Sequence, residues 1–288
     1  MTKRTISAPA DYRLSQSLGF LSGFTPQRVE SQQVEQLRFA TPLSPDWTTT
    51  TITVTQPGSD LEIEWIGDVD GDAVVDHVRR ILSIDVDADG LDDIIENDPV
   101  LQPLVDPTRG VRPPLFWSPY EAAVWAVLSQ RVQMKQASNL KDRLANAYGA
   151  DLKGQDLVAT PEPSTLAAID TFEKVPSTKI DRLHAVAHAA LDGGLDPTAL
   201  RTQPPEQAAI ELQTIDGIGP FSAELILVRG TGAPDVFPAN ERRLHTIMRS
   251  LYNMPDASTD DLASIAEQWS PFRSWISFQL RAAAERAQ

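Results

Sequence analysis

The stretch that decides the fold is Leu212–Arg229, with the sequence LQTIDGIGPFSAELILVR. Its centre is a tight Gly217-Ile218-Gly219 turn, and glycine lets a backbone adopt conformations barred to other residues and approach another backbone closely. Pro220 follows at once, as is typical of the first position of a helix. Apolar residues recur on both sides of the turn at helical spacing. The stretch therefore predicts two helices joined by a tight turn.

The predicted hairpin, at about residues 205–229, has a direct consequence for binding. The second helix begins right after the turn, so its free N–H groups and positive dipole end face outward. Such an end accepts a phosphate of a DNA strand through backbone groups, without reading the base sequence. We therefore expect Gly217, Ile218 and Gly219 to contact DNA. Two alternatives stay open: a glycine turn with no ligand, and the similar hairpins of ligases, nucleases and polymerases.

The net negative charge argues against a nucleic-acid ligand, but the distribution of the charge along the chain weakens that argument. The 288 residues carry a formal net charge of −15, and an acidic surface repels duplex DNA. Residues 1–110 hold 8 Lys and Arg against 19 Asp and Glu, whereas residues 111–288 hold 17 against 21. The acidity is concentrated in the first third, and the remainder is near neutral.

The composition also excludes several classes of protein. There are no cysteines, which excludes disulfides, thiolate zinc sites and cysteine-ligated iron–sulfur clusters. No apolar run approaches the ~18 residues that span a bilayer, and polar sequence stands where a signal peptide would be apolar. We expect a cytoplasmic, monomeric protein with no cofactor and no membrane association.

The first third, residues 1–110, is predicted to be an N-terminal α+β domain. Segments 34–43, 48–56 and 60–67 alternate in part between apolar and polar residues, and turn-forming residues separate them. One buried face is expected from Ile52, Val54, Leu61, Ile63 and Trp65. Apolar residues at helical spacing then predict a helix through Val74, Val75, Val78, Ile81 and Leu82.

Residues 111–288 are predicted to be helical almost throughout. Ser118 and Glu121 form a capping box with Pro119 in the first turn, and an amphipathic apolar stripe follows. Further helices are expected near residues 136–148, 164–168, 179–191, 205–214, 220–229, 241–248, 259–268 and 271–285. The predicted fold is therefore mainly α with an N-terminal α+β domain.

Beyond the hairpin the chain continues as VRGTGAPDVFPANERRL (Val228–Leu244), and this segment resembles the 3-methyladenine DNA glycosylase II type of the helix-hairpin-helix superfamily. Three other segments agree, in the order found in that family: Tyr12–Phe24, Ser118–Gln130 and Gln268–Trp275. The resemblance covers nearly the whole chain. It implies a glycosylase core of two helical lobes over residues 111–288, with the active site between the lobes.

The resemblance implies that Glu241 is the catalytic residue. The family places an Asp at the start of a helix shortly after the hairpin, and the apolar Leu244 supports this register. The expected chemistry is hydrolysis of the N-glycosidic bond of a flipped-out nucleotide, with the carboxylate stabilising the sugar cation and orienting a water. Glu is a departure, because its extra methylene moves the carboxylate by about 1 Å, which can cost ~10²-fold. A carboxylate that only caps the helix dipole is the alternative.

The resemblance also implies where DNA and the extruded base lie. Phe221, Phe272 and Trp125 would form a wall that stacks on the base, and plain core packing is the alternative for each. Bifunctional relatives carry a Lys at the position of Phe221, so we expect no β-lyase activity. Gln130 and Arg131 match the loop that wedges into DNA, where the Arg131 guanidinium either fills the vacated stack or holds a phosphate.

Two other patterns raise the question of a metal. Asp85–Glu96 (DVDADGLDDIIE) fits the calcium-loop pattern D-x-D-x-D-G-x5-E. Asp92, however, stands where such loops carry an apolar residue, and a solvated acidic surface is the alternative. His184 and His188 lie four residues apart on a predicted helix, but no third ligand is evident. We therefore predict no metal site.

Together these patterns predict a monofunctional base excision repair enzyme. Its substrate would be double-stranded DNA carrying alkylated bases such as 3-methyladenine. A non-catalytic or weakly catalytic damaged-DNA-binding protein on the same scaffold is one alternative. A calcium-regulated interaction module built on residues 68–98 is another.

Overall fold

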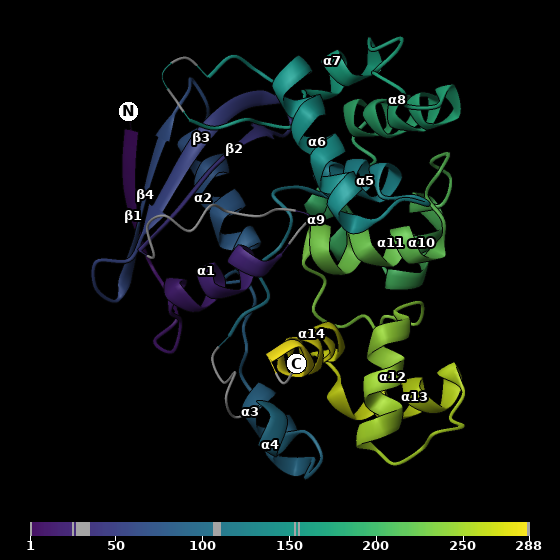
Figure 1. Ribbon diagram of the computed structural model, residues 1–288. Coiled ribbons are helices and arrows are strands. Elements are labelled where there is room, and N and C mark those ends of the chain that lie inside the picture. Colours follow the sequence, from purple (N-terminus) through teal and green to yellow (C-terminus); the bar gives the residue numbers. More distant parts are fainter. Residues whose placement is uncertain are drawn as a thin grey trace.

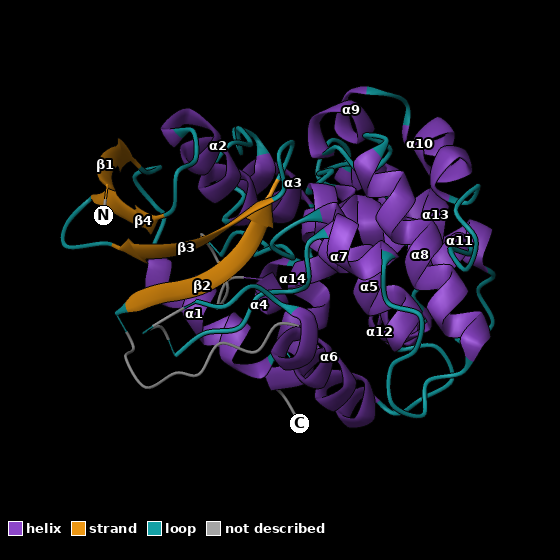
Figure 2. Ribbon diagram, turned by 90° about the horizontal axis from the view of Figure 1, so that it is seen from above, coloured by secondary structure: helices purple, strands orange, loops and turns teal. Residues whose placement is uncertain are grey.

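The computed structural model describes residues 2–24, 26, 35–105, 111–152, 154 and 156–286. A small sheet lies at one side of the molecule and helices make up the rest, as Figures 1 and 2 show from two directions. Within the described ranges no helix is both long and apolar enough to cross a membrane. The predicted class, mainly α with an N-terminal α+β region, is confirmed.

The sheet is antiparallel and has the strand order β1-β4-β3-β2. Its strands are β1 (Thr2–Ser7), β2 (Gln36–Leu43), β3 (Thr48–Thr55) and β4 (Asp60–Ile66). The three strands predicted from alternation are β2, β3 and β4, and the predicted face from Ile52 to Trp65 is buried. β1 was not predicted. It is an edge strand that pairs Thr2 with Trp65, and five of its six side chains are exposed, so it carries little apolar pattern.

Two helices pack on the sheet and complete the first core. They are α1 (Leu14–Gly23) and α2 (Gly71–Ile81). The predicted apolar stripe of α2 is confirmed, since Val74, Val78 and Ile81 are fully buried together with strand residues such as Leu61. Asp70 caps α2 by accepting a hydrogen bond from the Asp72 N–H.

The second core is helical and is built around α5 (Pro119–Leu128). The helices that surround α5 are α6 (Met134–Tyr148), α7 (Pro163–Ala167), α8 (Ser177–Leu191), α9 (Pro197–Thr202), α10 (Pro205–Leu212) and α11 (Pro220–Leu225). Ser118 caps α5 as predicted, accepting from the Glu121 N–H at 3.0 Å. The predicted capping box is incomplete, because the buried Glu121 carboxylate instead accepts from Thr41 and lies 3.7 Å from Lys141. The predicted amphipathic stripe is wrong, since α5 is buried on every side.

The third core joins the C-terminal helices to a segment from the first third of the chain. Its C-terminal helices are α12 (Arg242–Leu251), α13 (Thr259–Ala266) and α14 (Arg273–Arg286), with a 3-10 turn η4 (Glu267–Trp269). They pack against α3 (Leu91–Asn97), and α4 (Gln102–Val105) follows it. Leu91, Ile95 and Leu101 thus share a core with Leu244 and Trp269. Residues 91–101 were assigned to the N-terminal domain, but their apolar side chains belong to this second helical lobe.

Arg229 links the end of the hairpin to α1 and α14. Its guanidinium lies 4.5 Å from the ring centre of Phe24, 5.2 Å from that of Phe20 and 5.4 Å from that of Phe278. It also donates a hydrogen bond to the Pro114 carbonyl at 2.7 Å. Cation–π contacts of this kind are worth up to about 2 kcal/mol when desolvated. The end of the hairpin is therefore fixed against both α1 and α14.

Candidate functional site

The predicted hairpin is present as α10, a turn, and α11, which continues as one π-helical turn η3 (Ile226–Thr231). Gly217 has a φ of +87°, and a Cβ on it would lie 2.6 Å from Cδ of Arg182. Gly219 has an ordinary φ of −93° and nothing within 4 Å of a Cβ position. The fold therefore requires glycine at residue 217. Neither the backbone conformation nor the space around Cβ requires glycine at residue 219.

Gln130 fastens the loop after α5 to this hairpin. Its Nε2 donates to the Gly217 carbonyl at 2.6 Å, and its Oε1 accepts from Arg182 at 2.7 Å. Lys179 donates to the Leu128 carbonyl at 2.9 Å and to the Gln130 carbonyl at 3.2 Å. Burial, and then the charge of Arg182, lower the pKa of Lys179. The two groups of the Gln130 amide thus contact the protein itself, which makes this residue a tie between loop and hairpin.

The loop beyond Gln130 projects into solvent. Arg131 is exposed and has a φ of 56°, which turns the chain sharply. Val132 and Met134 are exposed as well, at 38% and 47%. An exposed cation beside exposed apolar side chains is the composition expected of a loop that enters DNA between base pairs.

Glu241 stands where the sequence predicted it, at the N-cap of α12. Its Oε1 accepts from the Arg243 N–H at 3.0 Å, and Leu244 is fully buried, as the predicted register requires. Nη1 of Arg281, on α14, lies 3.9 Å from the same oxygen. The carboxylate is partly exposed and has a guanidinium beside it, a partner that the sequence did not predict.

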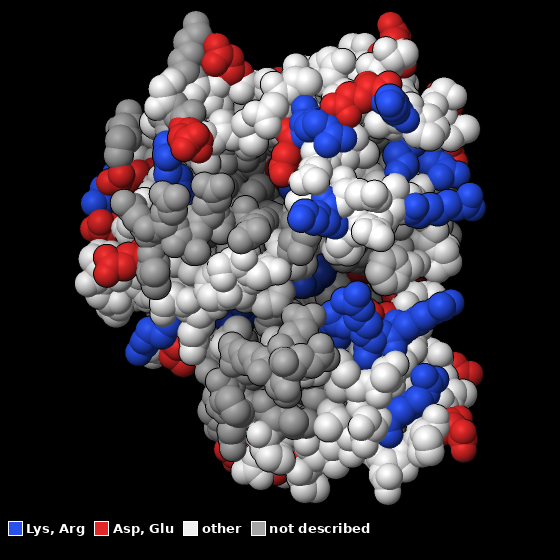
Figure 3. All heavy atoms as spheres, in the orientation of Figure 1, with Lys and Arg blue, Asp and Glu red and all other residues white. Residues whose placement is uncertain are grey.

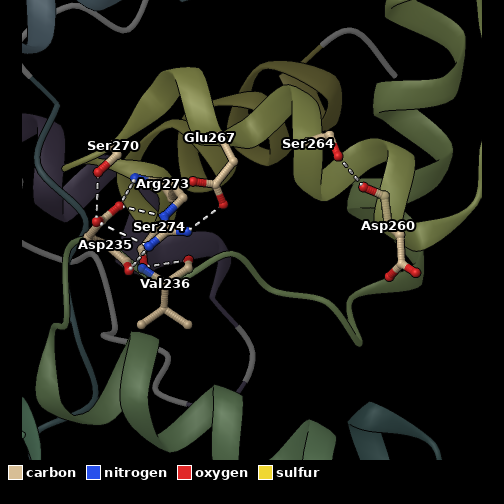
Figure 4. Close-up of polar contacts among 8 residues, drawn as sticks. All are labelled: Asp235, Val236, Asp260, Ser264, Glu267, Ser270, Arg273 and Ser274. Atoms are coloured by element: carbon tan, nitrogen blue, oxygen red, sulfur yellow. Dashed lines mark hydrogen bonds and ion pairs between the residues drawn. The ribbon is translucent and has the colours of Figure 1, made fainter. Parts of the chain in front are cut away.

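Asp235, six residues before Glu241, is an anchor (Figure 4). Its oxygens accept from Nε and Nη2 of Arg273 at 2.7 and 3.2 Å and from the Ser270 hydroxyl at 2.9 Å. Burial alone would raise its pKa, but these hydrogen bonds and the charge of Arg273 lower it. Ser274 adds hydrogen bonds to both backbone groups of Val236. The segment leading to Glu241 is thereby held against the start of α14.

Glu224 of α11 lies across from the residue that precedes Glu241. Its carboxylate accepts from the Asn240 backbone N–H at 2.9 Å and from Asn240 Nδ2 at 2.7 Å. Burial raises the pKa of Glu224, the hydrogen bonds from Asn240 lower it, and the charge of Glu241 raises it. The hairpin and the start of α12 therefore meet at a carboxylate that no sequence motif marked.

The three aromatic residues predicted to form the stacking wall differ in how far they are exposed. Trp125 is 3% exposed inside the core around α5, and Phe272 is 3% exposed in the C-terminal core, 5.8 Å from the Trp275 ring centre. Phe221, at the start of α11, is 51% exposed. Only Phe221 of the three presents its ring to solvent, because the other two are needed to fill the hydrophobic cores.

Some residues of the two patterns that raised a metal site make contacts within the protein. Asp85 pairs with Arg201 at 2.6 Å, and the Asp87 carboxylate accepts from the Asp89 N–H at 3.0 Å. His184 contacts the Ile169 carbonyl at 2.9 Å through Nε2. In the described part of the chain, no three His, Asp or Glu side chains are grouped so that they could hold a metal ion.

On the face of the molecule drawn in Figure 3, basic and acidic side chains are unevenly distributed. Figure 3 shows Lys and Arg side chains gathered over the helical part, around α6 and α8 and again over α12, while Asp and Glu lie largely around its margins. Arg242 and Arg243 at the start of α12 are both exposed. A basic face can attract a polyanion even when the net charge of the whole chain is negative.

A glycine hairpin, a helix-start carboxylate beside it, and a basic face over two helical lobes define a helix-hairpin-helix protein. The family model described as HhH-GPD superfamily base excision DNA repair protein matches residues 124–271. That is about half of the chain, and the chain belongs to this superfamily.

Individual proteins show the same relationship. The chain is 32% identical over 212 residues to a Mycobacterium tuberculosis protein named "Probable bifunctional transcriptional activator/DNA repair enzyme AlkA", covering 70% of this chain and 41% of that protein. It therefore spans about two fifths of that relative's length. It is 32% identical over 171 residues to DNA-3-methyladenine glycosylase 2 of Escherichia coli, covering 58% of each. The fold matches the 3-methyladenine DNA glycosylase structure of Archaeoglobus fulgidus, with a TM-score of 0.74, 21% identity and 97% of each chain covered.

Proposed function

We propose that this protein is a DNA glycosylase of base excision repair that hydrolyses the N-glycosidic bond of alkylated bases such as 3-methyladenine. The observation that carries the proposal is Glu241, a partly exposed carboxylate at a helix start beside the hairpin, in a chain of the base excision repair superfamily. The relatives named as 3-methyladenine glycosylases support the substrate class.

The proposed chemistry follows from the position of this carboxylate. Cleavage of the bond between base and sugar develops positive charge on the sugar, and an ionised carboxylate nearby stabilises that charge and orients the attacking water. The N–H of Arg243 holds Oε1 of Glu241 at 3.0 Å, so the orientation of the carboxylate is set before substrate arrives. The exposed ring of Phe221 is the surface on which an extruded base would stack, and a cationic alkylated purine gains from the ring's negative face.

The proposed enzyme is monofunctional. A Schiff-base mechanism needs an amine that attacks the sugar, and residue 221, two residues beyond Gly219, carries a phenyl ring. Borohydride should therefore trap no covalent adduct between protein and DNA, and abasic sites should stay uncleaved. Reproducible trapping would show that another amine acts as nucleophile and would refute this part of the proposal.

The proposed partner is double-stranded DNA containing a damaged base, and the working form is a monomer. The hairpin glycines offer a matched test of the DNA contact. The Cβ of a Gly219→Val variant would have no other residue within 4 Å apart from its chain neighbours, and the φ of residue 219 is ordinary. The variant should keep the fold yet weaken DNA affinity, because a side chain there blocks close approach of a phosphate. Gly217→Val should weaken binding through the hairpin itself, by collision with Arg182. A folded Gly219→Val variant with unchanged affinity would remove the turn from the DNA interface.

The proposal is tested most directly by base release. Purified protein is incubated with methylated and unmethylated duplex DNA, and the released bases are separated by chromatography. We expect alkylated purines to appear only from methylated DNA and in proportion to protein. Release no faster than in a protein-free control would refute the glycosylase proposal.

A second candidate is a damaged-DNA-binding protein that performs little or no chemistry. The observation that favours it is Arg281, whose guanidinium lies 3.9 Å from Glu241. This positive charge partly neutralises the carboxylate that would otherwise stabilise the sugar cation. Tight, damage-selective binding without base release would identify this function. Base release would exclude it.

A further inference from the structure

Glu224, on the second helix of the hairpin, accepts hydrogen bonds from Asn240, the residue before the proposed catalytic Glu241. Both oxygens of Glu224 are used: Oε2 accepts the Asn240 N–H and Oε1 accepts Asn240 Nδ2. Because one hydrogen bond goes to the backbone and the other to the side chain, Asn240 can neither rotate nor slide freely. Glu241 is the next residue, so its backbone is held by the same contact.

The other end of the short turn from Pro238 to Glu241 is held by α12 itself. The Glu241 N–H donates to the Pro238 carbonyl at 3.1 Å, and Nε2 of His245 lies 3.2 Å from that carbonyl. The His245 ring also stacks on Phe237, with ring centres 5.8 Å apart. Glu224 reaches this turn from the hairpin, and without it the turn loses the two hydrogen bonds that Asn240 donates.

The surroundings of Glu224 disfavour its ionised form, apart from the hydrogen bonds that it accepts from the turn. Burial and the charge of Glu241 both raise its pKa, and only the hydrogen bonds from the turn oppose them. Two carboxylates repel one another when both are ionised. The Asn240 hydrogen bonds offset that repulsion, and they also fix the distance between the hairpin and Glu241.

We propose that Glu224 is a positioning residue that couples the DNA-binding hairpin to the turn carrying Glu241. When the hairpin binds the DNA backbone, the contact through Glu224 then also fixes the position of the Glu241 carboxylate. This inference rests on the proposed glycosylase function for its kinetic readout. The coupling itself requires only that the hairpin binds DNA.

The kinetic test compares Glu224→Ala and Glu224→Gln with a control, Glu211→Gln. Glu211 is exposed on α10, the first hairpin helix, and its carboxylate pairs with Gln203 and Gln207. With DNA saturating, Glu224→Ala should lower the single-turnover rate of base release at least ~10-fold, because a displacement near 1 Å is costly at a reacting centre. Its DNA dissociation constant should stay within about twofold of the parent's, since no phosphate contact is lost. The Glu211→Gln rate should equal the parent's.

Two further variants separate positioning from general loss of stability. Glu224→Gln keeps one acceptor oxygen, so its rate should fall between those of the parent and Glu224→Ala. Asn240→Ala should cost as much as Glu224→Ala, and the double variant no more than either, because one contact is removed in all three. A parental rate in folded Glu224→Ala, or losses that simply add, would overturn the proposal.

Amide hydrogen exchange keeps the test independent of chemistry. Undamaged duplex DNA should slow exchange in residues 238–245 of the parent and should slow it much less in Glu224→Ala, while protection of the hairpin stays equal. A parent that binds DNA but releases no base would end the proposed function, yet this difference would still report the coupling. Equal slowing of residues 238–245 in both proteins, or none in the parent, would overturn it.

Discussion

Asp235 and Glu241 are two carboxylates six residues apart at the entrance to the same lobe, and they are bound very differently. Both oxygens of Asp235 accept hydrogen bonds, from Arg273 and Ser270. In the described part of the chain, the contacts of Glu241 with Arg243 and Arg281 both fall on Oε1. A carboxylate with both oxygens engaged holds structure, whereas one with an oxygen available can orient a water. Under the proposed function, this difference predicts that Asp235 serves mainly stability and Glu241 serves chemistry.

The largest effect should come from Glu241→Gln. Glutamine keeps the size of the side chain and removes the charge that faces the developing sugar cation, so base release should fall at least ~10²-fold. DNA affinity should stay the same or rise slightly, because a negative charge near phosphates is gone. Single-turnover assays on methylated duplex DNA measure the rate. An unchanged rate would break the comparison and move the chemistry away from Glu241.

Asp235→Asn should show the opposite division, with a large effect on stability and little on chemistry. Losing charge-assisted hydrogen bonds of this kind should lower the free energy of unfolding by about 2 kcal/mol at pH 7. The folded pKa of Asp235 is below the usual value, so its stabilisation is present above ~pH 4 and is lost as the pH falls through the folded pKa. The difference between parent and variant in the free energy of unfolding, measured with urea, should therefore become smaller at acidic pH.

The control for that experiment is Asp260→Asn. Asp260 is exposed on α13, in the same lobe, and its backbone carbonyl accepts a hydrogen bond from the Ser264 hydroxyl (Figure 4). Its substitution should change stability by less than about 0.5 kcal/mol at either pH. If folded Asp235→Asn lost base release as fully as Glu241→Gln, Asp235 would have to be counted with the chemistry.

Phe221→Ala should have a smaller effect, confined to the substrate. Stacking of a base on an aromatic ring is worth about 1–3 kcal/mol, so kcat/KM should fall roughly tenfold. Thermal stability should barely change, because the ring is 51% exposed. Ile210→Ala is the matched control: Ile210 is 60% exposed on α10, and kcat/KM should stay unchanged there. Equal losses in both variants would point to the hairpin surface in general instead of base stacking.

The local features of this fold could be predicted from the sequence because their causes are local. Glycine at residue 217 is required by a positive φ within the turn itself. The strands β2 to β4 follow from alternation, and the buried Leu244 agrees with the helix register that the family resemblance implied for Glu241. Each of these signals lies within a few residues of the structure it specifies.

The contacts that define the site could not be predicted, because they join distant parts of the chain. Arg281 meets Glu241 across 40 residues, and Glu224 meets Asn240 across 16. Neither pair leaves a pattern in a single sequence. The sequence left core packing and base contact open for Trp125 for a related reason: α5 is surrounded on all sides, so helical periodicity does not separate its core face from a site face.

The smallest effect should come from Glu241→Asp, which restores the residue that the resembled family carries. Aspartate is a good N-cap, so the hydrogen bond from Arg243 should survive. The shorter side chain withdraws from Arg281, which is already 3.9 Å away. Because the carboxylate here is held between α12 and α14, we expect base release to fall roughly fivefold, about 1 kcal/mol in the barrier, with DNA affinity unchanged.

Arg281→Met identifies the origin of that loss. If Arg281 holds the carboxylate in its working position, Arg281→Met alone should lower the rate by a similar factor, and adding Glu241→Asp should cost little more. A faster rate in Glu241→Asp, or in Arg281→Met, would mean that the ion pair restrains the carboxylate. The ion pair with Arg281 would then hold the Glu241 carboxylate away from its working position in the free protein. The difference between Glu241 and Asp235 in freedom to orient a water would then hold only in the DNA complex.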